Sequence, residues 1–536
     1  MKIFENGKFY LEKGRFCEAV LTDGETIRAV GGRDEMHALA GLAPAVVDCC
    51  GRTVLPGFND SHMHLSCIAA ANAQADLSGC RSIGQIVDTC RAFIASRPES
   101  AARGIRSMGW NQDLFEGEKR IPDRFDLDRI STEIPIVLER VCGHICVTNT
   151  KVLELMGIDV GATPPEGGTI GTDSEGKPNG VFTENAVAWV EQVIPDFTFE
   201  EKVRMFADAL DTCAACGLTS IQSNDVGAPN VYGDSDSIRT LFETGRATIR
   251  YRHQITFDDP EALNRFCDTE ARRDIYKGNR LTIGPLKLFK DGSLGARTAL
   301  MRRPYADDPC NCGVEALSDE KQEGLCRAAA ARGMQVITHV IGDAAVEKTV
   351  GIYERMMNGG PNTLRHALVH CQITDRPLLE RIARLGVLAM VQPIFLDYDM
   401  HVVESRCGRE LASTSYAFET LRRLGGHVSY GTDAPVESCN PFPNLYSAVT
   451  RKDKDGYPKD GFFPQECVGI CDAVDAYTLE SAYAEFAEGF KGRIRPGYLA
   501  DFTVLSDDIF TIEPDGIRDI AAEMTVVGGE IVYRRG

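Results

Sequence analysis

Short apolar runs alternate with segments of helical periodicity along the middle of the chain. The apolar runs predict strands at 283–289, 335–339 and 367–370, and the amphipathic segments predict helices at 321–332, 344–357 and 376–385. Because each helix returns the chain to the start of the next strand, this alternation is typical of an α/β fold with a parallel sheet. A (β/α)8 barrel of the TIM type needs about 250 residues or more. We therefore expect such a barrel over residues 56–491.

Both ends of the chain are rich in short strands. Such strands are expected throughout residues 1–55, where Asn6-Gly7 has the composition of a two-residue hairpin turn. Residues 492–536 contain a predicted strand at 500–505 and a predicted hairpin around Gly528-Gly529. We expect residues 1–55 and 492–536 to form one small β-sandwich domain.

A long stretch interrupts the barrel pattern near its start. Residues 70–165 exceed the length of one strand–helix unit, so we expect an inserted subdomain that shapes a pocket. The glycine-rich residues 167–180 lack the Gly-Lys-Ser/Thr ending of a phosphate-binding P-loop. A hairpin or a lid is the better interpretation of that segment.

The composition is that of an ordinary globular protein of 536 residues, with 43% hydrophobic residues. A formal net charge of −20 disfavours binding to nucleic acid or to an anionic membrane, since both would repel it. No apolar run approaches the roughly 20 residues of a membrane span, and residues 1–10 lack the apolar core of a signal peptide. We expect a cytoplasmic protein without a nucleic acid or a membrane as partner, and the charge says little about its substrate. Its oligomeric state stays open, with a homodimer among the options.

The cysteines argue for reduced thiols. There are 19 of them, scattered without the regular spacing of a disulfide framework. Cys213 and Cys216 have the Cys-x-x-Cys spacing of redox and zinc sites. They fall in an amphipathic helical stretch, so we expect them to serve as small buried residues.

Candidate chemistry begins with His62 and His64, which follow an apolar strand expected at 53–58. Residues i and i+2 of a strand point to the same face, so both imidazoles can reach one metal ion. Two surface histidines near a turn would give the same pattern. The pair alone therefore leaves both interpretations open.

Three further residues favour the metal site. His339 and His370 end predicted strands, and Asp433 follows a strand expected at 427–430. The active sites of barrels lie at the carboxyl ends of the strands. The 31 residues from His339 to His370 match one strand–helix unit, and the 63 residues from there to Asp433 match two. We expect these three side chains to join the first two histidines in one site.

Lys287 lies inside the apolar strand expected at 283–289. A lysine is costly to bury there unless it is paired or chemically modified. A lysine on an edge strand that extends its amine into solvent is the alternative. Lys290 is expected to lie in the following loop and to face solvent.

Together these motifs resemble the amidohydrolase superfamily, and more narrowly its amidohydrolase-3 (YtcJ-like) branch of metal-dependent hydrolases. The resemblance covers nearly the whole chain and rests on an ordered set of motifs. The motifs are His62-Met63-His64, Gly143-His144, Gly180 to Glu184, Lys287 with Asp291 to Arg297, His339 to Asp343, His370-Cys371-Gln372, Gln392-Pro393, Thr432 to Pro435 and Gly497 to Asp501.

The resemblance implies a site with one or two divalent metal ions, and zinc is the expected metal. The four histidines and Asp433 would be ligands, and Lys287 would carry a CO2-derived carbamate that bridges two ions. In some relatives a glutamate or a cysteine supplies the bridge, which makes Glu184 the alternative. The residues expected to contact a substrate are His144, Glu184, Arg297 and Gln392.

The expected reaction is metal-assisted hydrolysis of an amide-like C–N bond in an N-acyl, N-formyl or cyclic amide. Asp433 would take a proton from water as general base and pass it to the leaving amine. Deamination or another hydrolytic reaction of a heterocycle on the same scaffold is a second hypothesis. A non-catalytic binding protein is a third, although every expected ligand position is filled.

Overall fold

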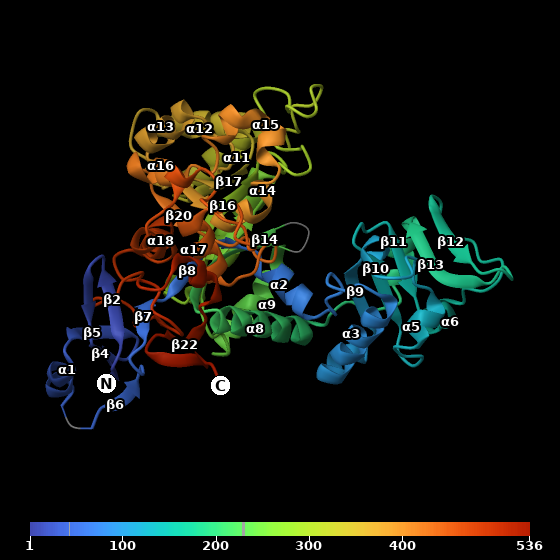
Figure 1. Cartoon of the computed structure of the whole chain (residues 1–536), viewed down its shortest axis with the longest axis horizontal. Helices are drawn as coiled ribbons and strands as arrows, with labels where there is room; N and C mark the ends of the chain where they lie inside the picture. The colour runs from blue at the N-terminus through green and yellow to red at the C-terminus, as the bar shows by residue number, and fades with distance from the viewer. Residues whose placement is uncertain (42, 228–230) are drawn as a thin grey trace. The chain divides into compact units, whose positions relative to one another are not determined.

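The computed structural model describes residues 1–41, 43–227 and 231–536. The chain forms two compact units (Figure 1). One contains Met1–Ser66 together with Phe206–Gly536, and the other contains Cys67–Met205. Both termini therefore belong to the larger unit.

The larger unit is built around eight parallel strands. In order around the sheet they are β8 (Phe58–Met63), β14 (Leu218–Gly227), β15 (Arg250–Thr256), β16 (Leu281–Phe289), β17 (Val336–Val340), β18 (Ala367–His370), β19 (Leu388–Val391) and β20 (Val428–Tyr430). The sheet closes where the Asp433 amide donates to the His62 carbonyl and the His64 amide donates to the Ala434 carbonyl, each at 2.8 Å. The expected TIM-type barrel is confirmed.

The predicted helices also form. They are α11 (Asp319–Ala331), α12 (Asp343–Met357) and α13 (Arg376–Leu385), and each boundary lies within about two residues of its prediction. The carboxylate of Asp375 accepts from the Leu378 amide and caps the start of α13. The other helices of at least six residues that lie wholly in this unit are α1 (Arg33–Ala40), α9 (Val231–Glu243), α10 (Pro260–Thr269), α15 (Val403–Ala412), α16 (Phe418–Arg423), α17 (Pro441–Thr450), α18 (Ile470–Tyr477) and α19 (Leu479–Ala484).

The chain enters the barrel at Gly57. The sequence predicts one strand at 53–58, but β7 (Thr53–Pro56) pairs with β2 and β21, whereas β8 opens the barrel. A Cβ at Gly57 would lie 2.1 Å from the side-chain oxygen of Thr219, so only glycine fits there. The single strand was a wrong prediction, because an apolar run does not show where the backbone leaves one sheet for another.

Two sheets form the small β domain, and both ends of the chain contribute to it. Their strand orders are β5-β4-β1-β6 and β23-β22-β21-β7-β2-β3. Phe502 packs edge-on against Phe4 and Phe9 in the shared core, with ring centroids 5.3 and 6.3 Å away. The strands are β1 (Lys2–Glu5), β2 (Lys8–Glu12), β3 (Arg15–Cys17), β4 (Ala19–Asp23), β5 (Thr26–Gly31), β6 (Ala45–Asp48), β21 (Phe502–Leu505), β22 (Ala522–Val527) and β23 (Glu530–Arg534).

The hairpin expected at Asn6-Gly7 is not formed. β1 and β2 flank these residues but pair with partners in different sheets. Asn6 does have the positive φ, 53°, that such a turn requires. Turn composition therefore predicted the local bend correctly and the strand pairing wrongly, because long-range partners decide the pairing.

The smaller unit has its own sheet and its own apolar cores. The strand order is β12-β13-β11-β10-β9, and the unit runs from Cys67 to Met205, beyond the expected limit at 165. The unit extends past residue 165 because β12 and β13, which form the hairpin expected at 167–180, are strands of its sheet. Helix α7 packs against this sheet. The elements are β9 (Ile105–Trp110), β10 (Ile136–Arg140), β11 (Ile145–Thr148), β12 (Gly168–Thr172), β13 (Pro178–Glu184), α3 (Ile83–Ser96), α4 (Pro98–Ala101), α5 (Arg124–Asp128), α6 (Thr150–Met156) and α7 (Asn185–Glu191); α2 (Leu65–Asn72) and α8 (Phe199–Ala215) cross its boundaries.

All 19 cysteines lie in the described residues, and no disulfide bond joins any of them there. Cys213 is buried in α8, and Cys216 just beyond the helix is half-buried. In the described part of the chain, no helix is long and apolar enough to cross a membrane.

Candidate metal centre

The carboxyl ends of the barrel strands bring the proposed ligands together. Ligand atoms of His62, His370 and Asp433 all lie within 4.8 Å of one another. His64 joins this group because its Nε2 lies 3.2 Å from Oδ1 of Asp433. His339 joins from β17, with its ring centroid 4.6 Å from that of His370. The parallel register of the strands therefore assembles all five side chains at one end of the barrel.

Two glutamines hold two of the histidines. Nδ1 of His62 lies 2.5 Å from Oε1 of Gln254, and Nδ1 of His370 lies 2.7 Å from Oε1 of Gln392. The amide nitrogen of Gln254 donates to the Ser61 carbonyl, which leaves its oxygen as the acceptor for the histidine. The imidazole Nδ1 of each ring is then the donor, and the lone pair of Nε2 is free to ligate a metal.

Backbone carbonyls hold the other two histidines. Nδ1 of His64 donates to the Asn224 carbonyl at 3.1 Å, so Nε2 is free. In His339 the pattern is reversed, since Nε2 donates to the Gly292 carbonyl at 3.1 Å and Nδ1 is left free. A carbonyl oxygen can only accept, which fixes the tautomer in both rings. The neutral forms of His62, His339 and His370 thus present one unprotonated nitrogen each, and in His64 the corresponding Nε2 lies beside Oδ1 of Asp433.

Burial keeps most of these imidazoles neutral. It lowers the pKa of His62 and His370 well below the usual value and lowers that of His339 to about 3, and the nearby Lys287 acts in the same direction. Burial acts likewise on His64, but the Asp433 carboxylate beside its Nε2 outweighs burial and raises the pKa of His64. A histidine must be neutral to ligate a metal, so burial favours the binding form of His62, His339 and His370.

Lys287 and Lys290 are both fully buried, and only their partners differ. The prediction that Lys290 faces solvent is wrong: its Nζ lies 2.7 Å from the Glu315 carboxylate and also pairs with Asp319, which compensates for its burial. Nζ of Lys287 has no hydrogen-bond partner in the described residues and lies 3.7 Å from the centroid of the Phe289 ring. Burial lowers the pKa of Lys287 to about 7. This unpaired amine is the one that modification would satisfy.

Two buried acids hold the backbone of the site in place: Asp60, which the sequence analysis missed, and Asp291, which it named only as part of a motif. Asp60 accepts from the amides of His62 and Thr432, both at 3.0 Å, and so joins the first strand of the barrel to the last. Asp291 accepts from two amides of the loop after β17. Asp60 could have been found, because it precedes His62 by two residues on one strand. Gln254 had no such signal, since it lies far away in the sequence.

The four residues expected to contact a substrate have protein partners in the structure. Gln392 holds His370, as described above. Arg297 forms two hydrogen bonds with Asp307, at 3.1 and 2.9 Å. In the smaller unit, Nδ1 of His144 lies 3.0 Å from the Glu184 carboxylate. A substrate contact stays a prediction for each of them, and so does the bridging role considered for Glu184.

The backbone is strained at two of the proposed ligands. His370 and Asp433 have φ values of 72° and 57°, in the left-handed region that glycine prefers. A residue held in such a conformation costs on the order of 1–3 kcal/mol, and strain of this kind clusters at functional sites. The surrounding hydrogen bonds therefore hold both side chains in positions that the backbone alone disfavours.

The donor set fits a divalent metal ion. Nε2 of His62 and Oδ1 of Asp433 are buried and lie 3.3 Å apart, in a geometry that makes no hydrogen bond. Buried polar atoms without partners are uncommon in proteins and need an explanation. Imidazole nitrogens and carboxylate oxygens are the usual ligands of zinc and similar ions. A metal ion between them would satisfy both atoms.

Known proteins place the chain in a family. Residues 45–533 match the model of the amidohydrolase family. The chain is 32% identical to the putative amidohydrolase YtcJ of Bacillus subtilis (strain 168), with 99% of both chains covered. It is 25% identical to the N-substituted formamide deformylase of Arthrobacter pascens, over 97% of this chain and 95% of that one.

A solved structure agrees with this placement. The crystal structure of an uncharacterized metal-dependent hydrolase from Pyrococcus horikoshii OT3 matches with a TM-score of 0.76 and 27% identity. The match covers 96% of this chain and 99% of that one. From the match to the family model and the identity to the Bacillus relative, we conclude that this chain belongs to the amidohydrolase family.

Proposed function

We propose that this protein is a metal-dependent hydrolase that cleaves an amide-like C–N bond of a small molecule, such as an N-acyl, N-formyl or cyclic amide. One observation supports this above all. Buried, unpaired atoms of His62, Asp433 and Lys287 occur together at the carboxyl end of the barrel. Active sites of barrel enzymes lie at this end.

The four histidines and Asp433 would hold one or two divalent ions, and zinc suits their nitrogen and oxygen atoms. A metal ion bound there would lower the pKa of water and polarise a carbonyl group. Lys287 would add an oxygen ligand as a carbamate: neutral Nζ attacks the carbon of CO2, one proton leaves, and a group with one negative charge results. A pKa of about 7 keeps a large share of this amine neutral near physiological pH.

Proton transfer is the role that we assign to Asp433. Its Oδ1 lies 3.3 Å from Nε2 of His62 and 3.2 Å from Nε2 of His64, so the carboxylate is at the centre of the donor set. It would take a proton from water and deliver it to the leaving nitrogen as the C–N bond breaks. The histidines are suited to metal ligation instead, because one ring nitrogen of each is hydrogen-bonded to a protein oxygen, which leaves the other for a metal ion.

Aromatic side chains beside the metal centre bear on the substrate. Phe289 is 39% exposed next to Lys287, and the half-buried Phe395 stacks on His370 with ring centroids 5.7 Å apart. Such rings offer apolar contact area next to the reacting bond. They favour a substrate with an apolar group. The name of the Arthrobacter relative, an N-substituted formamide deformylase, supports a formamide as the first substrate to test.

Replacement of Asp433 by Asn tests the assignment. Asp433→Asn keeps the size of the side chain but removes the base, so turnover on a panel of N-substituted formamides and cyclic amides should fall by about 10²–10⁴-fold. Metal content is measured in parallel by mass spectrometry, to separate loss of the base from loss of metal. The control is Asp515→Asn, at an exposed acid that pairs with Lys452. Turnover of Asp433→Asn equal to that of wild type would refute the proposed role.

A further inference from the structure

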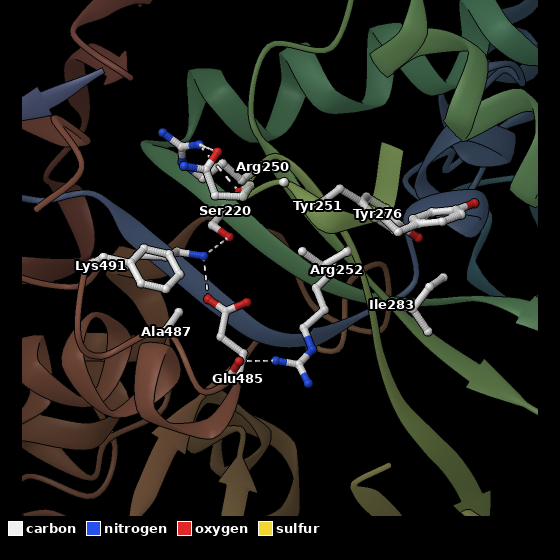
Figure 2. A pocket seen from close by; sticks show the side chains of 13 residues that line it. Ser220, Arg250, Tyr251, Arg252, Tyr276, Ile283, Glu485, Ala487 and Lys491 are labelled. Atoms are coloured by element: carbon white, nitrogen blue, oxygen red, sulfur yellow. Dashed lines mark hydrogen bonds and ion pairs between the residues drawn. The ribbon is translucent and has the colours of Figure 1, made fainter. Parts of the chain in front are cut away.

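A second pocket lies at the opposite end of the barrel from the metal centre. The first residues of β14, β15 and β16 line it together with residues 485–491 (Figure 2), and its volume is about 270 Å³. Arg250 and Arg252 line it, and both belong to the strand that carries Gln254. Along this strand Arg250 lies four residues and Arg252 two residues before Gln254, which is about 13 and 7 Å. The residues that line the pocket include neither the proposed metal ligands nor the glutamines that hold them, so the pocket is distinct from the metal centre.

One of its cations is fully compensated. Arg250 is 1% exposed and binds the Asp501 carboxylate with two hydrogen bonds, of 2.8 and 3.0 Å. Glu25 lies 3.9 Å from the same guanidinium, and Arg280 pairs with that glutamate at 2.9 Å. These four groups balance one another, so they leave no charge for a ligand.

A second cation is also compensated. Lys491 is 7% exposed and forms an ion pair with Glu485, as well as a hydrogen bond with the Ser220 hydroxyl. The same carboxylate accepts from the Asn59 side chain at 2.8 Å. The acid next to the pocket is thus already occupied by two donors.

Arg252 carries the charge that remains. It is 8% exposed and forms no ion pair with a carboxylate of the described residues. Nη1 donates to the backbone carbonyl of Glu485, while the buried Nε has no partner there. Figure 2 shows its side chain reaching toward Glu485 on the side away from Lys491. A guanidinium stays protonated even when buried, so an unpaired charge at this position is costly.

We propose that this pocket binds a small oxyanion, the carboxylate or phosphate group of a small molecule, with Arg252 as its charged partner. The guanidinium can donate two hydrogen bonds to such a group in one plane. Exposed Gly278 and Asn279 at the rim leave the pocket open to solvent. Phe490, 40% exposed, offers apolar surface to the rest of an organic anion. The volume of about 270 Å³ admits only a small ligand.

The binding test uses the metal-loaded protein and two probes, inorganic phosphate and acetate. Thermal unfolding is followed over a titration of each, with sodium chloride holding the ionic strength constant. We expect saturable stabilisation by at least one probe, and the more effective probe identifies the chemistry as phosphate or carboxylate. In Arg252→Gln the apparent affinity should fall at least tenfold. The matched control, Arg327→Gln, removes an exposed arginine of α11 and should leave the affinity unchanged.

A second variant, Asn279→Asp, tests the proposal even if Arg252→Gln does not fold. Asn279→Asp adds a negative charge at the rim and removes no buried group, and the new carboxylate can pair with Arg250, which already donates to Asn279 at 3.0 Å. It should weaken binding of the probe by about tenfold through repulsion. Stabilisation that both variants retain would place the anion elsewhere, the metal centre included, and overturn the proposal. Equal effects of phosphate, acetate and chloride would overturn it as well. Neither result depends on whether the protein hydrolyses amides.

Discussion

Replacement of His253 by Leu should make the barrel less sensitive to acid. His253 lies in β15 and is fully buried, and neither ring nitrogen has a hydrogen-bond partner in the described residues. Its neighbours are the rings of Tyr251 and Tyr276, with centroids 4.8 and 5.8 Å away. Leucine has a similar volume and no polar atoms, so it suits this apolar position better than the imidazole does.

The size of the effect follows from the pKa. Burial lowers the pKa of His253 from 6.5 to about 3. Below pH 6.5 the unfolded chain binds a proton at this residue and the folded protein does not. Protonation of the unfolded chain therefore costs the folded protein almost no stability above pH 6.5. As the pH falls from 6.5 toward 3, it lowers the free energy of unfolding progressively. At pH 5.0, about 1.5 units below the unfolded value, the loss is about 2 kcal/mol.

The assay is urea unfolding of the metal-free protein at pH 7.5 and pH 5.0, followed by circular dichroism. The free-energy advantage of His253→Leu over wild type should be about 2 kcal/mol larger at pH 5.0 than at pH 7.5. His401→Gln, a change at an exposed histidine, is the control for other effects of acid on the chain. An advantage that is the same at both pH values would show that the buried ring does not resist protonation.

Three further predictions concern the metal centre and the barrel entrance. Gln392→Leu removes the acceptor that orients His370, so metal affinity, measured by competition with a chelator, should fall about 10–100-fold. Lys290→Met removes one of the two lysines that pair with Glu315 and Asp319, and Lys348 remains as the other, so the free energy of unfolding should fall by about 1 kcal/mol. Lys287→Met, by contrast, should abolish turnover and leave the metal-free protein at least as stable as wild type. Equal stability losses in the two lysine variants would contradict this. Gly57→Val should lower the melting temperature or prevent folding, since even a Cβ has no room there; an unchanged melting temperature would contradict the packing.

Local patterns predicted much of the barrel. The strand at 367–370 and the helix at 376–385 have the expected boundaries, because the spacing of apolar residues reports which face each element buries. The candidate ligands followed from the same reasoning. His339 and His370 end parallel strands, and the ends of parallel strands meet at one edge of a sheet. Short-range information was sufficient for both results.

Other features depended on contacts between distant parts of the chain. The sequence could not show that the apolar run at 53–58 divides between two sheets, since that depends on pairing with β21, which lies hundreds of residues away. Nor could it separate Lys287 from Lys290, because burial and ion pairing are properties of the folded neighbourhood. By itself the sequence determined the type of fold and the residue types available for a metal. Only the tertiary structure decided which lysine lacks a partner and which glutamines orient the histidines, because those contacts join strands that sequence spacing does not relate.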